Sequence, residues 1–280
     1  MIELFTADTP NGKKITIMLE EIGCDFKVTK IDLSKDEQFK TDFKKISPFG
    51  KIPVITDHEN GQSLFESGAI LIYLAEKYNK FYEVKDRNVI NQWLMAQMGI
   101  IGPMIGQHHQ FHHYNPGKSE FGEERYFKIT KRIYSELDER LSSSKYLAGN
   151  EYTIADIATW PWIARHEWHD IGLKNYNNLT RWYLDIAKRE AVVTEVKAVS
   201  AIVKEMLGIV KQSYGVALTA SHMGHIAFEH NVTITHLRSR VADLEDEIAS
   251  WVHRSSQDAT AAMTLAEENV VLAQANRELH

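Results

Sequence analysis

The sequence predicts an α+β domain at the N-terminus, an all-α domain after it, and a long helical tail. Three observations support this fold class. Strand and helix patterns alternate within residues 1–80, helical periodicity without a convincing strand runs over 86–207, and a heptad repeat covers 231–280. Residues 208–230 are expected to form the linker before the tail, because the stretch YGVALTASHMGH within them is typical of a connecting segment.

The first half of the N-terminal domain carries a strand, a helix and a second strand. Residues 2–5, IELF, are a short apolar strand. Apolar side chains recur at helical spacing over 11–22, and Gly23 is expected to end that helix. The stretch 26–31 alternates apolar and polar residues with period two, which predicts a strand.

The second half of this domain predicts a hairpin and a closing helix. The stretches KIPVITD and QSLFE flank the turn sequence HENG, which is the pattern of two antiparallel strands. Residues 67–78 then carry a helical pattern, with Ser67 expected as its N-cap. The predicted order is β-α-β-α-β-β-α, an α+β layer arrangement.

The all-α domain carries long helical patterns at 123–141 and 153–168. Thr153 and Asp156 have the spacing of a capping box, so we expect Asp156 to fix the start of a buried helix rather than to act as an acid or base. Four tryptophans are expected in the core, with the alternative that one of them lines a ligand pocket. They are Trp160, Trp162, Trp168 and Trp182.

The tail differs from the rest of the chain in composition. No lysine follows Lys211, and four arginines stand against nine acidic residues, a net charge of about −5. Apolar residues from Ile234 to Trp251 alternate by three and four, which predicts a coiled coil; one long helix folded against the body is the alternative. The stretch SHMGH resembles a cloning scar, so the tail is either a fused segment or a natural extension.

Charge and hydropathy exclude several classes of function. The net charge of −6 argues against nucleic-acid binding by a basic face. No apolar run reaches the roughly 18 residues of a membrane span, and MIELF lacks the features of a secretion signal, so we expect a cytosolic protein. A single cysteine excludes an internal disulfide framework.

The turn Thr9-Pro10-Asn11-Gly12, which precedes the first helix, has two interpretations. In the first, Thr9 caps the helix and Pro10 fits its first turn. In the second, the turn is an anion site, because a helix N-terminus carries partial positive charge and lowers the pKa of a thiol placed there. Thr9 would offer a hydroxyl and Asn11 an amide donor. The turn alone does not separate the two.

Two further features favour a ligand site. Pro53 stands directly before a strand, where its peptide bond can be cis and the backbone of Ile52 can pair with a peptide ligand; a rigid strand start is the alternative. Glu66 and Ser67 begin another helix, where they suit an ammonium and a carboxylate; simple capping is the alternative. Together the three places would hold a small zwitterionic peptide with its thiol at the first helix.

Several long motifs carry a family resemblance. The stretches TPNGKKITIMLEE, EQF, ISPFGKIPVITD, LFESGAILIYLAEKY, GPMIGQ, ERY and YTIADIATWPW, in this order, resemble the nu-class bacterial glutathione transferases, relatives of the yeast nitrogen-regulator prion protein. The resemblance spans about residues 1–205 and leaves out the tail. It implies the glutathione transferase fold, with a thioredoxin-like domain and an all-helical domain, and a homodimer.

The resemblance also implies a site and an activity. It places the glutathione sulfur beside Thr9 and Asn11, as the catalytic residues, and gives Ile52 a backbone contact beside a cis Pro53. The implied activity is glutathione-dependent reduction of small disulfides and of organic hydroperoxides, with weak transferase activity and no metal. The alternative is a non-catalytic glutathione-binding regulator that uses the tail to recruit a partner.

The rest of the implied site surrounds the peptide part of glutathione. Gln38 in EQF and Lys51 border the peptide, while Glu66 and Ser67 take the γ-glutamyl end. Arg125 in ERY reaches glutathione from the helical domain.

The single cysteine and a histidine-rich stretch are expected to have neither a redox nor a metal-binding role. Cys24 follows the helix-ending Gly23, far from an activating N-terminus, and is expected to be structural. The stretch GQHHQFHHY has the histidine pairs 108/112 and 109/113, each on one helix face. A zinc site needs a third ligand, which the sequence does not indicate, so we expect these histidines to form a wall of the substrate pocket.

Overall fold

The computed structural model describes residues 1–194, which fall within one compact unit. The end of the predicted helical domain, residues 195–207, lies outside this part of the chain. So do the predicted linker at 208–230 and the predicted coiled coil at 231–280.

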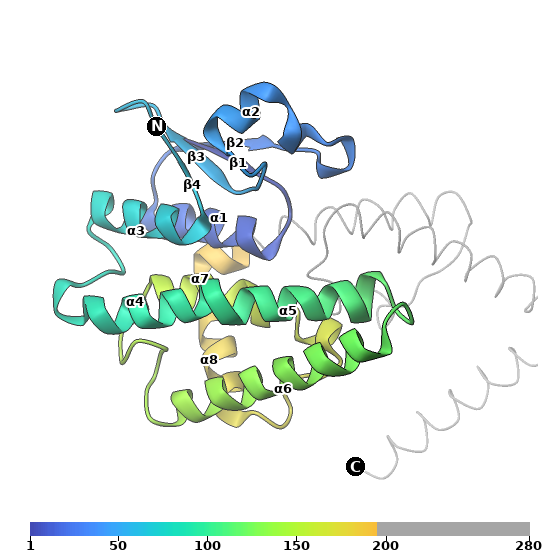
Figure 1. The fold of residues 1–280 in the computed structure, drawn as a ribbon. Coiled ribbons are helices and arrows are strands. Elements are labelled where there is room, and N and C mark those ends of the chain that lie inside the picture. The colour runs from blue at the N-terminus through green and yellow to red at the C-terminus, as the bar shows by residue number, and fades with distance from the viewer. Residues whose placement is uncertain (195–280) are drawn as a thin grey trace, which may run out of the picture. The chain divides into compact units, whose positions relative to one another are not determined.

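A four-stranded mixed sheet forms the N-terminal domain (Figure 1). Its strands are β1 (Ile2–Thr6), β2 (Phe26–Lys30), β3 (Val54–Asp57) and β4 (Gln62–Phe65), in the spatial order β2-β1-β3-β4. β1 pairs parallel with β2 and antiparallel with β3, and β3 pairs antiparallel with β4. The strands predicted at 2–5 and 26–31 and the predicted hairpin are therefore confirmed.

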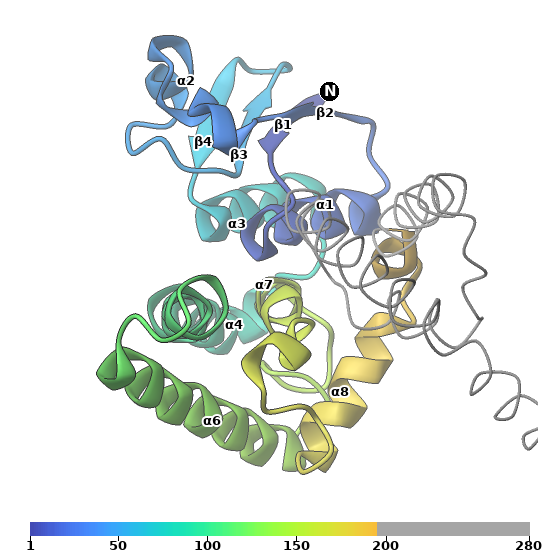
Figure 2. The ribbon, with the colours of Figure 1, turned by 90° about the vertical axis from the view of Figure 1, so that its right-hand side faces the viewer.

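Helices cover both faces of this sheet. α1 (Pro10–Ile22) and α3 (Ser67–Tyr78) lie between the sheet and the helical domain, and α2 (Thr41–Ile46) lies on the far side (Figures 1 and 2). The core between sheet and helices is made of fully buried aliphatic side chains, as the alternating strands and the apolar stripe of α1 predict. Its members include Ile2, Leu4, Ile15, Met18, Leu19, Ile55, Ile70 and Leu71.

The ends of α1 and α3 test the predicted caps. Gly23 ends α1 in the left-handed conformation, at φ 73°, as predicted. The prediction of Ser67 as N-cap of α3 is wrong, because Glu66 holds the cap position and Ser67 is the first helical residue. The Ser67 hydroxyl instead accepts a hydrogen bond from the ammonium group of Lys14, at 3.3 Å, which commits its oxygen to a partner outside the helix.

The helical domain contains five α-helices within residues 86–194. They are α4 (Arg87–Ala96), α5 (Gly102–His108), α6 (Glu120–Ser142), α7 (Ile154–Ile163) and α8 (Asn177–Ala187). Two π-helical segments, Gln97–Ile101 and His109–Tyr114, extend α4 and α5. No strand occurs in this part of the chain, as predicted, and no helix of residues 1–194 is long and apolar enough to cross a membrane.

The helix α7 is the centre of this domain, because all ten of its residues are buried. The helical pattern predicted to 168 ends earlier, at Ile163, since the backbone of Arg165 leaves the helical region at φ −99° and ψ 25°; a separate 3-10 turn, His166–His169, follows. The four tryptophans are buried, which confirms the core prediction.

The predicted capping box starts α7. The Thr153 hydroxyl accepts from Ala155 N at 3.3 Å, and the Asp156 carboxylate accepts from Thr153 N at 3.0 Å. Asp156 is fully buried and also accepts from Leu147 N at 2.9 Å and from Trp182 Nε1 at 2.8 Å. One carboxylate therefore joins the loop before α7, the start of α7 and the helix α8.

Asp156→Ala is expected to lower the free energy of unfolding by about 3–5 kcal/mol, because it leaves several buried N–H groups without an acceptor. Urea unfolding followed by circular dichroism measures this loss. Glu136→Ala on α6 is the control, since the Glu136 side chain is 66% exposed and its removal should change the free energy by less than about 0.5 kcal/mol. Equal effects of the two substitutions would contradict the structural role of Asp156.

Candidate active site

The N-terminus of α1 lies at the end of β1 and presents the turn singled out in the sequence. Thr9 has an extended backbone, and its Oγ1 accepts a hydrogen bond from Gly12 N at 3.1 Å. A hydroxyl has two lone pairs and one proton, so this cap leaves the Thr9 proton free to donate to an anion. The two interpretations of the turn, helix cap and anion site, are therefore compatible.

Gly12 allows the helix to begin this close to the strand. A Cβ at this position would lie 2.3 Å from Thr6 Oγ1 and 2.4 Å from Ala7 O, nearer than any side chain can approach. The absence of a side chain therefore sets where the free N–H groups of α1 point.

The Asn11 side chain is half-buried in the first turn of α1. Its Oδ1 accepts a hydrogen bond from the indole Nε1 of Trp162, on α7, at 3.3 Å. Within residues 1–194 the amide nitrogen of Asn11 donates to no other group, so both of its protons can be given to a ligand. Trp162 is therefore the tryptophan that contacts a predicted site residue.

The loop before β3 holds an unpaired stretch of backbone. The peptide bond between Ile52 and Pro53 is cis, as the sequence suggested. Ser47 Oγ bonds both the nitrogen and the oxygen of Lys51, at 3.0 and 2.7 Å, and holds this loop in place. Within residues 1–194 the backbone of Ile52 has no hydrogen-bond partner, and the Lys51 side chain is exposed. An extended peptide ligand could pair with such a backbone.

Gln38 is the predicted site residue whose surroundings most clearly call for a ligand. It lies in the 3-10 turn Glu37–Phe39 and is only 9% exposed. Its Nε2 reaches Asp36 Oδ1 at 3.5 Å, whereas its Oε1 is buried without a hydrogen-bond partner among residues 1–194. Buried polar atoms are normally paired, so this oxygen is suited to accept an N–H from a bound molecule.

The N-terminus of α3 brings Glu66 and Ser67 together with a residue that the sequence reasoning missed. Glu66 is exposed and has a positive φ of 70°, a strained conformation that tends to occur at functional sites. Ser67 is buried, and its Oγ accepts from the Nζ of Lys14. Lys14 Nζ also bonds Gln97 Oε1 at 2.6 Å, so three elements meet at this nitrogen.

Lys14 is 1% exposed, and burial lowers the pKa of its amine to about 7. The negative charge of Glu66 acts in the opposite direction and raises this pKa. A signal for this burial was present, because Lys14 lies four residues before Met18 and so extends the apolar stripe of α1 by one turn. A lysine on that stripe must find acceptors in the interior.

Arg125 has no bond to the other predicted site residues. Arg125 is exposed on α6, with its guanidinium 6.0 Å from the ring centre of Tyr126. It forms no hydrogen bond or ion pair with any of the site residues described above.

His108 and His109 are buried, at 0% and 4% exposure, which corrects the expectation of a pocket wall for these two, whereas His112 and His113 are half-buried. His109 Nε2 lies 2.7 Å from Nε2 of His169, and Tyr134 Oη lies 2.5 Å from Nδ1 of His169. Burial lowers the pKa of His109 and of His169 well below 6.5, so both rings are neutral at pH 7. No group of three or more metal-binding side chains is found among residues 1–194.

Cys24 is half-buried beyond the C-terminal end of α1, and burial raises the pKa of its thiol. This location and this pKa direction favour the structural role expected from the sequence, because the thiolate is the reactive form.

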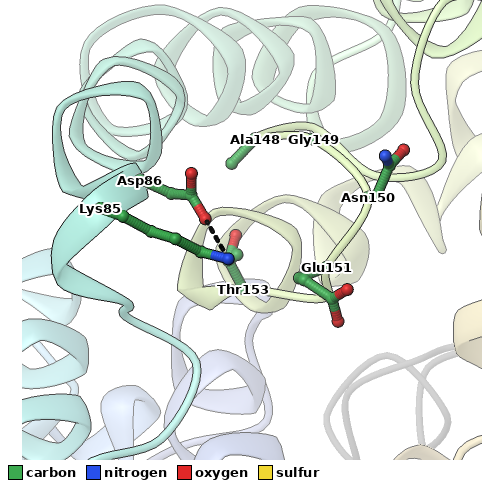
Figure 3. Close-up of a pocket in the computed structure, with 7 residues that line it drawn as sticks. All are labelled: Lys85, Asp86, Ala148, Gly149, Asn150, Glu151 and Thr153. Atoms are coloured by element: carbon green, nitrogen blue, oxygen red, sulfur yellow. Dashed lines mark ion pairs between the residues drawn. The ribbon is translucent and has the colours of Figure 1, made fainter.

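A surface pocket of about 360 Å³ lies elsewhere, between Lys85 and Asp86 on one side and the loop before α7 on the other (Figure 3). Its remaining lining residues are Ala148, Gly149, Asn150, Glu151 and Thr153. None of the predicted site residues belongs to it, so its location does not bear on the site at α1.

Comparisons with known proteins match both domains. Residues 2–76 match the model of the glutathione S-transferase N-terminal domain, and residues 95–190 match that of the C-terminal domain. The disulfide-bond oxidoreductase YfcG of Escherichia coli K12 is 46% identical over 198 residues, which are 68% of this chain and 92% of that protein.

Solved structures agree with this match. A glutathione transferase from Burkholderia graminis, with two glutathione molecules bound per subunit, is 35% identical and has a TM-score of 0.65, covering 69% of this chain and 86% of that one. A glutathione transferase from Pseudomonas putida, with one glutathione disulfide per subunit, is 37% identical and has a TM-score of 0.64, covering 69% and 89%. Fold, family models and identity together show that this chain is an enzyme of the glutathione S-transferase family.

Proposed function

We propose that this chain reduces small disulfides with glutathione, by holding the glutathione sulfur as a thiolate at the N-terminus of α1. The observation that carries the proposal is the pair of donors at that terminus. Among residues 1–194 the Thr9 hydroxyl proton and the Asn11 amide nitrogen have no hydrogen-bond acceptor, and no cysteine is present in the turn. The reactive sulfur must then come with the ligand, and the name of the 46% identical relative supports this chemistry.

The thiolate is stabilised by two effects. The free N–H groups and partial positive charge of the first turn of α1 favour an anion there. Hydrogen bonds from Thr9 and Asn11 to the sulfur favour the charged form further and so lower the pKa of the thiol. A larger thiolate fraction at pH 7 speeds thiol–disulfide exchange.

The peptide part of glutathione is proposed to lie along the loop before β3 and the start of α3. The backbone of Ile52, beside Pro53, pairs with the ligand backbone, and the buried Oε1 of Gln38 accepts one of its N–H groups. The exposed Lys51 lies along the border of the peptide. Arg125, which is exposed on α6, would reach the ligand from the helical domain.

The γ-glutamyl end is proposed to lie at Glu66 and Ser67. The Glu66 carboxylate suits the ammonium group of the ligand. The Ser67 hydroxyl accepts from Lys14 and donates to Met98 Sδ at 3.7 Å; thioether sulfur is a weak acceptor, so a ligand carboxylate would take over this proton. The positive charge of protonated Lys14 directly behind Ser67 favours a carboxylate in this place.

The reaction then consists of two exchange steps. The thiolate held by Thr9 and Asn11 attacks one sulfur of the substrate disulfide, forms a mixed disulfide and releases the other sulfur as a thiolate, which takes up a proton. The thiolate of a second glutathione attacks the glutathione sulfur of the mixed disulfide, which forms oxidised glutathione and releases the second substrate thiol. Two glutathione molecules supply the two electrons that the substrate disulfide gains.

The proposal has three further parts, of which the first two use the same thiolate. It can attack the outer oxygen of an organic hydroperoxide, after which a second glutathione yields oxidised glutathione, an alcohol and water. Transfer of glutathione to electrophiles is a weak side activity. The enzyme works in the cytosol as a homodimer, and the exposed side chains of Phe65, Met95 and Ile100, which are apolar, are suited to a subunit contact.

Asn11→Ala is expected to reduce the turnover of hydroxyethyl disulfide with glutathione roughly 10²-fold, because one donor to the developing thiolate is lost. The variant should keep its fold, since Asn11 is half-buried and makes one hydrogen bond. Cys24→Ser is the matched control and should leave turnover nearly unchanged. Turnover of Asn11→Ala at the wild-type rate would contradict the proposed site, and glutathione binding without turnover by the wild type would indicate the non-catalytic regulator instead.

Lys14→Met tests the buried amine through the pH dependence of stability. The pKa of Lys14 is about 7 in the folded chain and 10.5 as a model value, so the unfolded chain binds an extra proton between these pH values. The free energy of unfolding of the wild type should therefore rise with pH relative to Lys14→Met, by up to about 1.4 kcal/mol per pH unit between pH 7 and 10.

Urea unfolding at pH 6 to 10 measures this difference. Lys128→Met, at a side chain that is 70% exposed, is the control and should follow the wild-type curve. Parallel curves for the wild type and Lys14→Met would show that the buried amine does not titrate in this range.

A further inference from the structure

We propose that Trp162 is a positioning residue for catalysis, which fixes the carboxamide of Asn11 so that its NH2 group faces the thiolate. This inference rests on the function proposed above. Trp162 belongs to α7 of the helical domain, whereas Asn11 belongs to the thioredoxin-like domain, and α7 packs against α1 (Figure 2).

The chemistry of the indole determines the orientation of the amide. The indole of Trp162 has a single polar group, an N–H that can only donate. Its partner must therefore be the oxygen of the Asn11 amide, at 3.3 Å, and not the nitrogen. A carboxamide that binds through its oxygen presents its two N–H donors on the other branch of the group. Rotation by 180° would place the amide nitrogen against the indole N–H and the amide oxygen against the thiolate, and both contacts are repulsive.

The indole itself is held on several sides. Trp162 is 8% exposed. A Cβ on Gly102 would lie 3.3 Å from its Cε2, and a Cβ on Gly106 would lie 3.3 Å from its Cη2, so the backbone near α5 contacts the ring directly. The ring of His109 stacks on it, with 5.9 Å between centroids and 19° between planes. A ring packed in this way has little freedom to rotate, so its N–H keeps a fixed direction toward Asn11.

The contacts of His109 extend this support into the core. His109 lies against His169, which lies against Tyr134 on α6, in a buried series of neutral polar groups. The position of the Asn11 donor is therefore set by the helical domain.

Trp162→Phe removes the indole N–H and retains an aromatic ring. In the wild-type background it should lower kcat for hydroxyethyl disulfide at saturating glutathione roughly 3- to 10-fold, the effect of one neutral hydrogen bond. It should also shift the rise of kcat with pH to higher pH, because a less well-oriented donor stabilises the bound thiolate less. In the Asn11→Ala background the same substitution should have no further effect on kcat, since no amide is left to orient.

Trp160→Phe is the matched control. Trp160 is on the same helix, is 3% exposed, and donates its indole N–H to the backbone oxygen of Tyr183 at 3.1 Å. Trp160→Phe removes an indole N–H at a similar burial but away from Asn11. It should leave kcat and the pH profile of kcat unchanged.

Two results would overturn the proposal. The first is an unchanged kcat in Trp162→Phe, and the second is an equal loss in the wild-type and Asn11→Ala backgrounds, which would show that Trp162 acts through packing alone. If Asn11→Ala itself retains full turnover, the assignment of Asn11 fails and this proposal fails with it. If Asn11→Ala loses turnover but Trp162→Phe does not, only the role of Trp162 is overturned and the proposed function stands. If Trp162→Phe does not fold, kcat is measured instead for Trp162→Leu, which also lacks a donor, in the wild-type and Asn11→Ala backgrounds.

Discussion

The hydrogen bond from Gly12 N to Thr9 Oγ1 is the contact on which the candidate site depends. It starts α1 at a defined residue, shortly after the end of β1, where the other N–H groups of the first turn have no acceptor within the helix. Thr9 can cap the helix and still donate its proton, so the same residue serves structure and chemistry. The turn needs no cysteine under this account, because the ligand carries the sulfur to donors that are already in place.

Residues of both domains orient the proposed donors. Asn11 and Ser67 belong to the thioredoxin-like domain, and each can act as donor or acceptor. Each is fixed in its acceptor role, toward the interior, by a group that can only donate. Trp162 bonds the Asn11 oxygen, and Lys14, itself held by Gln97 of the helical domain, bonds the Ser67 oxygen. In the proposed site the Asn11 amide group is thereby left to donate toward the ligand, whereas the Ser67 hydroxyl donates to Met98 Sδ at 3.7 Å, a weak acceptor that a ligand carboxylate would replace.

Local patterns in the sequence predicted the parts of the fold that depend on local interactions. The helix at 11–22, its end at Gly23 and the capping box of Thr153 and Asp156 are set by neighbours within a few residues, and they are confirmed. Ser67 as a helix cap is wrong because Glu66 holds the cap position, and the hydroxyl of Ser67 binds Lys14, 53 positions earlier in the chain. The contact of Trp162 with Asn11 spans 151 positions, and no local pattern indicates such a pair. The burial of Lys14 was open to prediction, but its partner Gln97 was not.

A crystal structure of the full chain grown with glutathione shows where the sulfur of the bound peptide lies. We expect the sulfur within hydrogen-bond reach of both Thr9 Oγ1 and Asn11 Nδ2, while Oδ1 of Asn11 stays on Trp162 Nε1. A sulfur that points away from both donors, with the peptide part still bound along Ile52 and Ser67, would contradict this expectation.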